Sequence, residues 1–123
     1  MSLILIVEDN EKNLKLVRDV LQVKGYKTLE SGTAEDGIKL AIEKKPDLIL
    51  MDIQLPGMNG IEALKVLRAD PATSAIPVIA VTASVMQQDR TLITEAGFDG
   101  YVSKPISIKE FLEAVNKALA GKA

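Results

Sequence analysis

The strongest constraint on the fold of this 123-residue chain is an apolar run that ends abruptly in a carboxylate. In Asp47–Asp52, four consecutive apolar residues lie between two aspartates, and a loop signal with Pro56 and Gly57 follows. A run of this kind, without polar alternation, predicts a strand that is buried on both faces, as in the middle of a parallel sheet. Asp52 would then lie at the carboxyl edge of the sheet, where open α/β sheets place their ligands.

Four further segments have a strand pattern, and helical patterns alternate with the strands. The five predicted strands are 3–7, 26–30, 47–52, 77–82 and 100–103. Asn10 and Thr33 are placed as helix caps, and Gly25 as a helix stop. Short connections favour right-handed βαβ units. The prediction is an α/β domain with a doubly wound, five-stranded parallel (βα)5 sheet, flavodoxin-like, with strand order 2-1-3-4-5.

The helical patterns also predict which residues face the core. In the second helix Ile42 is assigned to the inner face, and in the last helix Ile108 is assigned to the inner face. A weaker pattern through Met86, Ile93 and Ala96 predicts a helix between the fourth and fifth strands, closed by Gly97.

The composition excludes several classes of site and partner. The chain has no cysteine and no histidine, which excludes disulfides, thiol nucleophiles, imidazole catalysis and the usual zinc sites. A net charge of -2 gives no electrostatic reason to expect nucleic acid or an anionic membrane as a partner. The apolar start, residues 3–7, is too short for a signal peptide or a membrane span. We therefore expect a cytoplasmic protein with a single domain over residues 1–123 and no output domain.

Polar residues gather at the ends of the predicted strands. Glu8 and Asp9 follow the first strand, Asp52 and Thr82 end the third and fourth, and Lys104 follows the fifth. Each has an ordinary explanation alone: an acidic helix start, a loop aspartate, a β-favouring threonine, a solvated lysine. Together, three carboxylates require a cation between them, and oxygen ligands favour Mg²⁺. A lysine and a hydroxyl facing them would hold a phosphoryl group, which indicates phosphorylation of a carboxylate.

Four segments carrying these residues resemble the receiver domain of two-component response regulators. They are residues 6–10, 50–60, 76–83 and 104–105. The resemblance extends from about Leu3 to Leu119, and it is especially close to single-domain regulators of the DivK type and to receivers attached to hybrid kinases. It implies a phosphorelay switch, a phosphoacceptor module with only weak self-phosphorylation and self-dephosphorylation activity rather than an enzyme.

The resemblance also implies the roles of individual residues. Asp52 would accept a phosphoryl group from a phosphohistidine on a sensor histidine kinase or a histidine phosphotransferase. Glu8, Asp9 and Asp52, with the backbone carbonyl of Gln54, would bind Mg²⁺. Glu8 stands where many members of the family have aspartate, and its longer side chain would change the affinity for the metal.

The same resemblance implies how the signal leaves the site. Lys104 would contact one phosphoryl oxygen, and Thr82 would move inward to bind another. Tyr101 matches the aromatic residue that turns inward with the threonine. The face formed by the fourth helix, the fifth strand and the last helix would then bind a downstream protein target, with the chain acting as a monomer or a weak dimer.

Two other functions remain open on the residues alone. A phosphatase of the haloacid-dehalogenase type also uses a strand-end aspartate with Mg²⁺, but it needs a second aspartate two positions later, where this chain has Gln54. A flavodoxin-like nucleotide or flavin binder needs a phosphate-binding loop after the first strand. The segment 8–10 is acidic and lacks glycine, so it would repel a phosphate.

Overall fold

The computed structural model describes residues 2–53, 55, 57–82, 93, 95–104 and 106–120. It contains a five-stranded parallel sheet with the order β2-β1-β3-β4-β5, so the predicted fold class and strand order are confirmed. The strands are β1 (Leu3–Val7), β2 (Lys27–Ser31), β3 (Leu48–Asp52), β4 (Val78–Thr82) and β5 (Gly100–Ser103). The helices are α1 (Glu11–Val23), α2 (Ala34–Lys44), α3 (Gly60–Ala69) and α5 (Ile108–Ala120).

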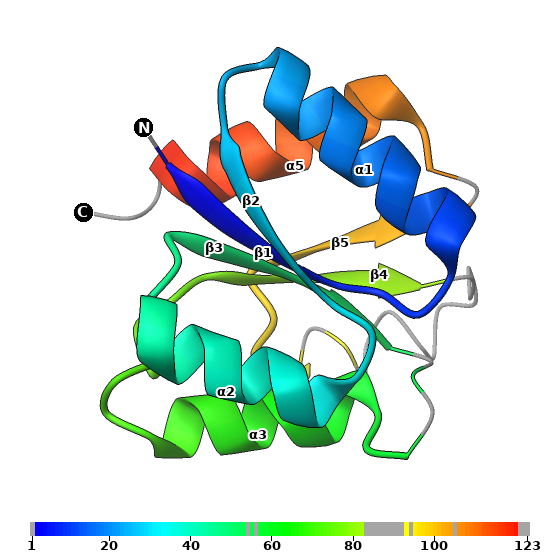
Figure 1. The fold of residues 1–123 in the computed structure, drawn as a ribbon. Helices are drawn as coiled ribbons and strands as arrows, with labels where there is room; N and C mark the ends of the chain where they lie inside the picture. Colours follow the sequence, from blue (N-terminus) through cyan, green and yellow to red (C-terminus); the bar gives the residue numbers. More distant parts are fainter. Residues whose placement is uncertain are drawn as a thin grey trace.

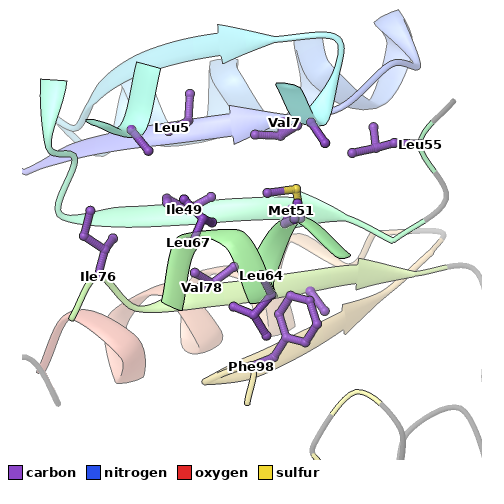
Figure 2. Close-up of a cluster of buried hydrophobic side chains, with 14 of the residues drawn as sticks. Leu5, Val7, Ile49, Met51, Leu55, Leu64, Leu67, Ile76, Val78 and Phe98 are labelled. Carbon is purple, nitrogen blue, oxygen red and sulfur yellow. The ribbon is translucent and has the colours of Figure 1, made fainter. Parts of the chain in front are cut away.

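The sheet is the middle of three layers. Helices α1 and α5 cover one face, and α2 and α3 cover the other (Figure 1). Every residue of β3 is buried, because successive side chains pack alternately against the two helical layers. Leu48 and Leu50 belong to the α1/α5 side, whereas Ile49 and Met51 belong to the α2/α3 side, part of which Figure 2 shows. The predicted burial of this strand on both faces is confirmed.

The predicted helix boundaries are confirmed where caps were assigned. The Asn10 side chain accepts hydrogen bonds from the backbone N–H groups of Lys12 and Asn13 at the start of α1. Thr33 accepts one from Asp36 N–H at the start of α2. Such caps satisfy donors that have no partner within the helix. Gly25 follows α1 with a φ of 89°, a conformation that a side chain disfavours.

The prediction that Ile42 faces the core is wrong, because 38% of this residue is exposed. Helix α2 contacts the sheet along Ala34, Gly37 and Ala41, all of which are buried. A Cβ on Gly37 would lie 2.7 Å from a methyl group of Val7, so this helix approaches β1 unusually closely. These small residues form the side of the helix that contacts the sheet. Because successive residues of a helix are rotated by about 100°, Ile42 points away from the side that carries Ala41 and toward solvent.

The inward placement of Ile108 is also wrong, because it is 48% exposed. The buried residues of α5 are Phe111 and Val115. Ile108 is the first residue of the helix. Its side chain lines a groove together with Val20 and Val23 of α1 and does not face the sheet as predicted.

The predicted fourth helix lies mostly outside the described residues, which include 93, 95 and 96 in helical conformation and then Gly97 with a φ of 104°. Within the described ranges, no helix has the length and apolar character needed to cross a membrane.

Truncating Phe111 to alanine tests the packing of α5 on the sheet. The side chain is 1% exposed, so its removal leaves a cavity and should lower the free energy of unfolding by about 3–5 kcal/mol. Urea unfolding monitored by circular dichroism measures the loss. Val23→Ala is the matched control, because Val23 is 84% exposed and should change stability by less than about 0.5 kcal/mol. Equal losses in the two variants would contradict this packing.

Candidate functional site

The carboxyl ends of four neighbouring strands meet at one edge of the sheet, as predicted. Asp52 pairs with Val81, and Thr82 pairs with Ser103. Backbone hydrogen bonds continue past the strands: Ile53 N–H donates to Val81 O at 3.0 Å, and Lys104 N–H donates to Thr82 O at 2.7 Å. The backbone around each candidate residue is therefore held by its neighbour.

Three carboxylates form the acidic part of the site. Glu8, Asp9 and Asp52 each offer an oxygen atom, and these atoms lie within 4.8 Å of one another. Glu8 is 5% and Asp52 2% exposed, whereas Asp9 is exposed to solvent. Two buried carboxylates this close repel each other strongly unless positive charge is present.

Lys104 supplies positive charge to both buried carboxylates. Its Nζ lies 3.1 Å from Glu8 Oε1 and 3.1 Å from Asp52 Oδ2. The lysine side chain is 19% exposed and is therefore less deeply buried than the side chains of Glu8 and Asp52, which are 5% and 3% exposed. Of the residues that the strand ends predicted as a group, Lys104 thus contacts Glu8 and Asp52 directly.

The arrangement changes the protonation of Glu8. Burial is the main cause that raises its pKa, and the hydrogen bond and the negative charge of Asp52 raise it further. Lys104 and the N–H group of Asn10, which donates to Glu8 Oε2 at 3.2 Å, lower it in part. The resulting pKa of Glu8 is about 7, against an ordinary value of 4.5.

The pKa of Lys104 is also raised, but for a lysine this means that the site stabilises the charged form. Burial alone would lower the pKa of its ammonium group, but the hydrogen bonds and charges of Glu8 and Asp52 outweigh burial and raise it. The lysine therefore stays protonated while Glu8 titrates near neutral pH.

The two predicted switch residues, Thr82 and Tyr101, lie on the neighbouring strands β4 and β5 and differ in burial. Thr82 ends β4 and is 2% exposed. Tyr101 lies in β5, is half-buried, and packs against the apolar cluster on the α2/α3 side of the sheet. The predicted carbonyl ligand, Gln54, lies outside the described residues.

The donor set matches the requirements of a Mg²⁺ site. The three carboxylates of Glu8, Asp9 and Asp52 offer hard oxygen ligands, and the exposed position of Asp9 leaves one side of the cluster open to water. Mg²⁺ favours such oxygen ligands and usually keeps several waters in its coordination shell. The predicted magnesium site is therefore compatible with the residues present.

Comparison with known proteins decides the family. Residues 4–116 match the family model of the response regulator receiver domain. The chain is a response regulator receiver domain. It is accordingly a phosphorylation switch of two-component signalling, which implies a histidine kinase as phosphodonor, and it is not a classical enzyme. Of the three predicted functions, the phosphorelay switch is confirmed.

Relatives of this receiver domain include single-domain regulators and receivers of kinases. It is 47% identical over 116 residues to the polar-differentiation response regulator DivK of Brucella anthropi, and 94% of each chain is covered. It is 30% identical, with a TM-score of 0.90 and 98% coverage of both chains, to the receiver domain of a Pseudomonas aeruginosa sensor histidine kinase, whose crystal structure has a magnesium ion coordinated in the active site cleft. A receiver domain protein from Methanospirillum hungatei is 28% identical, with a TM-score of 0.90 and coverage of 99% and 96%.

Two contributors to the site were missed by sequence reasoning. The N–H group of Asn10 donates to Glu8, although Asn10 was predicted only as a helix cap. The sequence pattern assigns Gly60 no role in the site, but it is buried as the first residue of α3, beside the backbone of Asp52. Neither contact has a residue pattern that would have revealed it.

The raised pKa of Glu8 predicts how the stability of the metal-free receiver domain depends on pH. The folded state retains a proton that the unfolded state releases above pH 4.5, so this group stabilises the fold fully below pH 4.5. The contribution is lost as the pH rises through about 7, with an upper limit of about 3 kcal/mol. Urea unfolding in EDTA at a series of pH values measures the slope.

Glu8→Gln should abolish this part of the slope, and Glu43→Gln, on the exposed surface of α2, should leave it unchanged. A slope that is the same in all three proteins would refute the assignment to Glu8.

Proposed function

We propose that Asp52 is the phosphoacceptor of this receiver domain, and that Glu8, Asp9, Asp52 and the carbonyl of Gln54 hold Mg²⁺. The observation that supports the proposal most strongly is the placement of Asp52. It is a buried carboxylate at the end of a rigid central strand, 3.1 Å from an ammonium group and within 4.8 Å of two other carboxylates. A metal ion at this cluster would neutralise the charge between the carboxylates and the oxygens of an incoming phosphoryl group.

In the proposed transfer, an Asp52 carboxylate oxygen forms a bond to phosphorus, while the bond between phosphorus and the histidine nitrogen of the donor protein breaks. The strand holds the attacking oxygen in place, which lowers the entropic cost of the transfer. Lys104 moves from its two carboxylate partners to a phosphoryl oxygen, where its charge offsets the negative charge of the product. Thr82 would donate its hydroxyl to another phosphoryl oxygen.

We further propose that the signal leaves through Thr82 and Tyr101. Phosphorylation replaces the single negative charge of the Asp52 carboxylate with a phosphoryl group that carries close to two, and it adds acceptor oxygens at a buried position, which can bias a neighbouring element between two arrangements. Inward movement of Thr82 would make room for the ring of Tyr101. This half-buried ring packs against the apolar cluster on the α2/α3 side of the sheet. The altered face, formed by β5, α5 and the segment before β5, would bind a downstream protein. We propose that this receiver acts in the cytoplasm as a monomer or weak dimer.

Substituting Asp52 with asparagine tests the acceptor. With Mg²⁺ and acetyl phosphate, the unsubstituted protein should gain the mass of one phosphoryl group in intact-mass spectrometry, and Asp52→Asn should gain none because the amide cannot accept it. Asp47→Asn is the matched control: Asp47 precedes the same strand at its other end, where its carboxylate accepts a hydrogen bond from Leu3 N–H at 2.8 Å. Labelling of Asp52→Asn, or of the unsubstituted protein in EDTA, would contradict the proposal.

Replacing Lys104 with methionine separates metal binding from phosphoryl transfer. The ammonium group competes with a metal cation for Glu8 and Asp52, so its removal should tighten Mg²⁺ binding about threefold to tenfold. Phosphorylation at saturating Mg²⁺ should become about 10- to 100-fold slower, because a charge that stabilises the transferred group is lost.

Isothermal titration with Mg²⁺ and time-resolved mass spectrometry give the two readouts. Lys109→Met, at an exposed position of α5, should leave both unchanged. Weaker Mg²⁺ binding by Lys104→Met would show that the lysine does not oppose the metal.

A further inference from the structure

Gly60 lies in unusually close contact with the backbone of Asp52. An ideal Cβ built on Gly60 would lie 2.6 Å from the carbonyl oxygen of Asp52 and 2.9 Å from Cα of Ile53. Both distances are below 3.0 Å, which real Cβ atoms essentially never approach. The N–H group of Gly60 also donates to Ile53 O at 3.1 Å. The start of α3 therefore rests directly on the peptide that follows the proposed phosphoacceptor.

The need for glycine here is a matter of space and not of backbone conformation. Gly57, in the same loop, has a φ of 75°, which explains a glycine in the usual way. Gly60 has no positive φ, and its position is the first helical residue, capped by Asn59, whose side chain accepts from Glu62 N–H at 2.9 Å. Any side chain would meet the backbone of Asp52 instead of open space.

The helix cannot readily move away to make room. Ala63, Leu64 and Leu67 of α3 are at most 1% exposed and belong to the apolar cluster on this face, in which Figure 2 labels Leu64 and Leu67. Their burial holds the helix against β3 and β4. An added methyl group at position 60 would thus be forced against the peptide between Asp52 and Ile53, so at least part of the resulting displacement would fall on that peptide.

We propose that Gly60 is a positioning residue for phosphorylation: its lack of a side chain lets α3 support the Asp52 peptide and so aims the Asp52 carboxylate at Glu8 and Lys104. This inference rests on the proposed role of Asp52. The carboxylate and the supported carbonyl belong to the same residue, so a displacement of one reorients the other. Because transfer depends on alignment, a misplacement of about 1 Å can slow a reaction by about 100-fold.

Gly60→Ala tests the proposal, with Gly37→Ala as the matched control. Gly37 is also a buried helical glycine on the same face of the sheet, but its Cβ would press on the side chain of Val7, at 2.7 Å, and not on backbone. At saturating Mg²⁺ and acetyl phosphate, Gly60→Ala should be labelled about 10- to 100-fold more slowly than the unsubstituted protein. Gly37→Ala should remain within about threefold. Circular dichroism confirms that both variants are folded at the temperature of the assay.

A spectroscopic readout distinguishes positioning from a general loss of stability. The ¹³C resonance of the Asp52 carboxyl group should shift in Gly60→Ala and stay in place in Gly37→Ala. Labelling of Gly60→Ala within threefold of the unsubstituted protein, with an unshifted resonance, would overturn the inference. Absence of labelling on Asp52 in the unsubstituted protein would instead overturn the proposed function.

A second pair of variants serves if Gly60→Ala does not fold. Asn59→Ala removes the cap of α3, and Thr33→Ala removes the equivalent cap of α2. Both should lower the stability of the fold by a similar amount, because each removes one capping hydrogen bond. Only Asn59→Ala loosens the turn that supports Asp52, so it should be labelled severalfold more slowly than Thr33→Ala. Equal rates for these two variants would also overturn the inference.

Discussion

Two carboxylates buried side by side, Glu8 and Asp52, are the constraint on which the site depends. Their repulsion opposes folding, and a proton on Glu8 together with the ammonium group of Lys104 limits it in the metal-free protein. With Glu8, Asp9 and Asp52 ionised and Lys104 protonated, the charges of -3 and +1 leave a net charge of -2. A divalent cation bound at the cluster would cancel this charge, so the same repulsion that opposes folding would favour binding of the proposed metal.

The architecture keeps these charges together because each is attached to a different part of a rigid sheet. β3 is hydrogen-bonded to β1 on one side and to β4 on the other, and helices cover both of its faces. The acceptor strand therefore cannot relieve the repulsion by shifting along its neighbours, since a shift would break two ladders and two packed layers. We therefore expect movement in side chains and in the loops beyond the strands; Thr82 is the last residue of β4, and Lys104 directly follows β5.

The pattern of the sequence predicted the sheet and the membership of the site for a definite physical reason. A strand that is buried on both faces has to be apolar throughout, so the polar residue that ends the run stands out, as Asp52 does. Parallel strands then bring such endings together whatever the loops contain. The individual roles of Asp52, Thr82 and Tyr101 in signalling came from the resemblance to receiver domains, and they remain proposals.

The errors share a cause in three-dimensional packing. Helical periodicity indicates which side of a helix is apolar but not which residues on that side touch the sheet. In α2 the close approach at Gly37 places the contact on the side of Gly37 and Ala41 and leaves Ile42 exposed. The contact of Gly60 with Asp52 joins two segments whose approach depends on how α3 docks, and glycine before a helix is more often a turn residue. The paired distances from Lys104 to Glu8 and Asp52 are likewise a property of the assembled strand ends and of no local pattern.

The attachment of the site to strand ends has a consequence for how such a protein can diversify. β1, β3 and β4 each contain five residues, and the candidate residues either end them or follow at once. Insertions in the connecting loops away from the residues that contact the site leave this spacing intact, whereas a single-residue deletion inside a strand would rotate a site residue to the opposite face. The exposed helices can thus acquire new recognition surfaces while the chemistry is inherited unchanged.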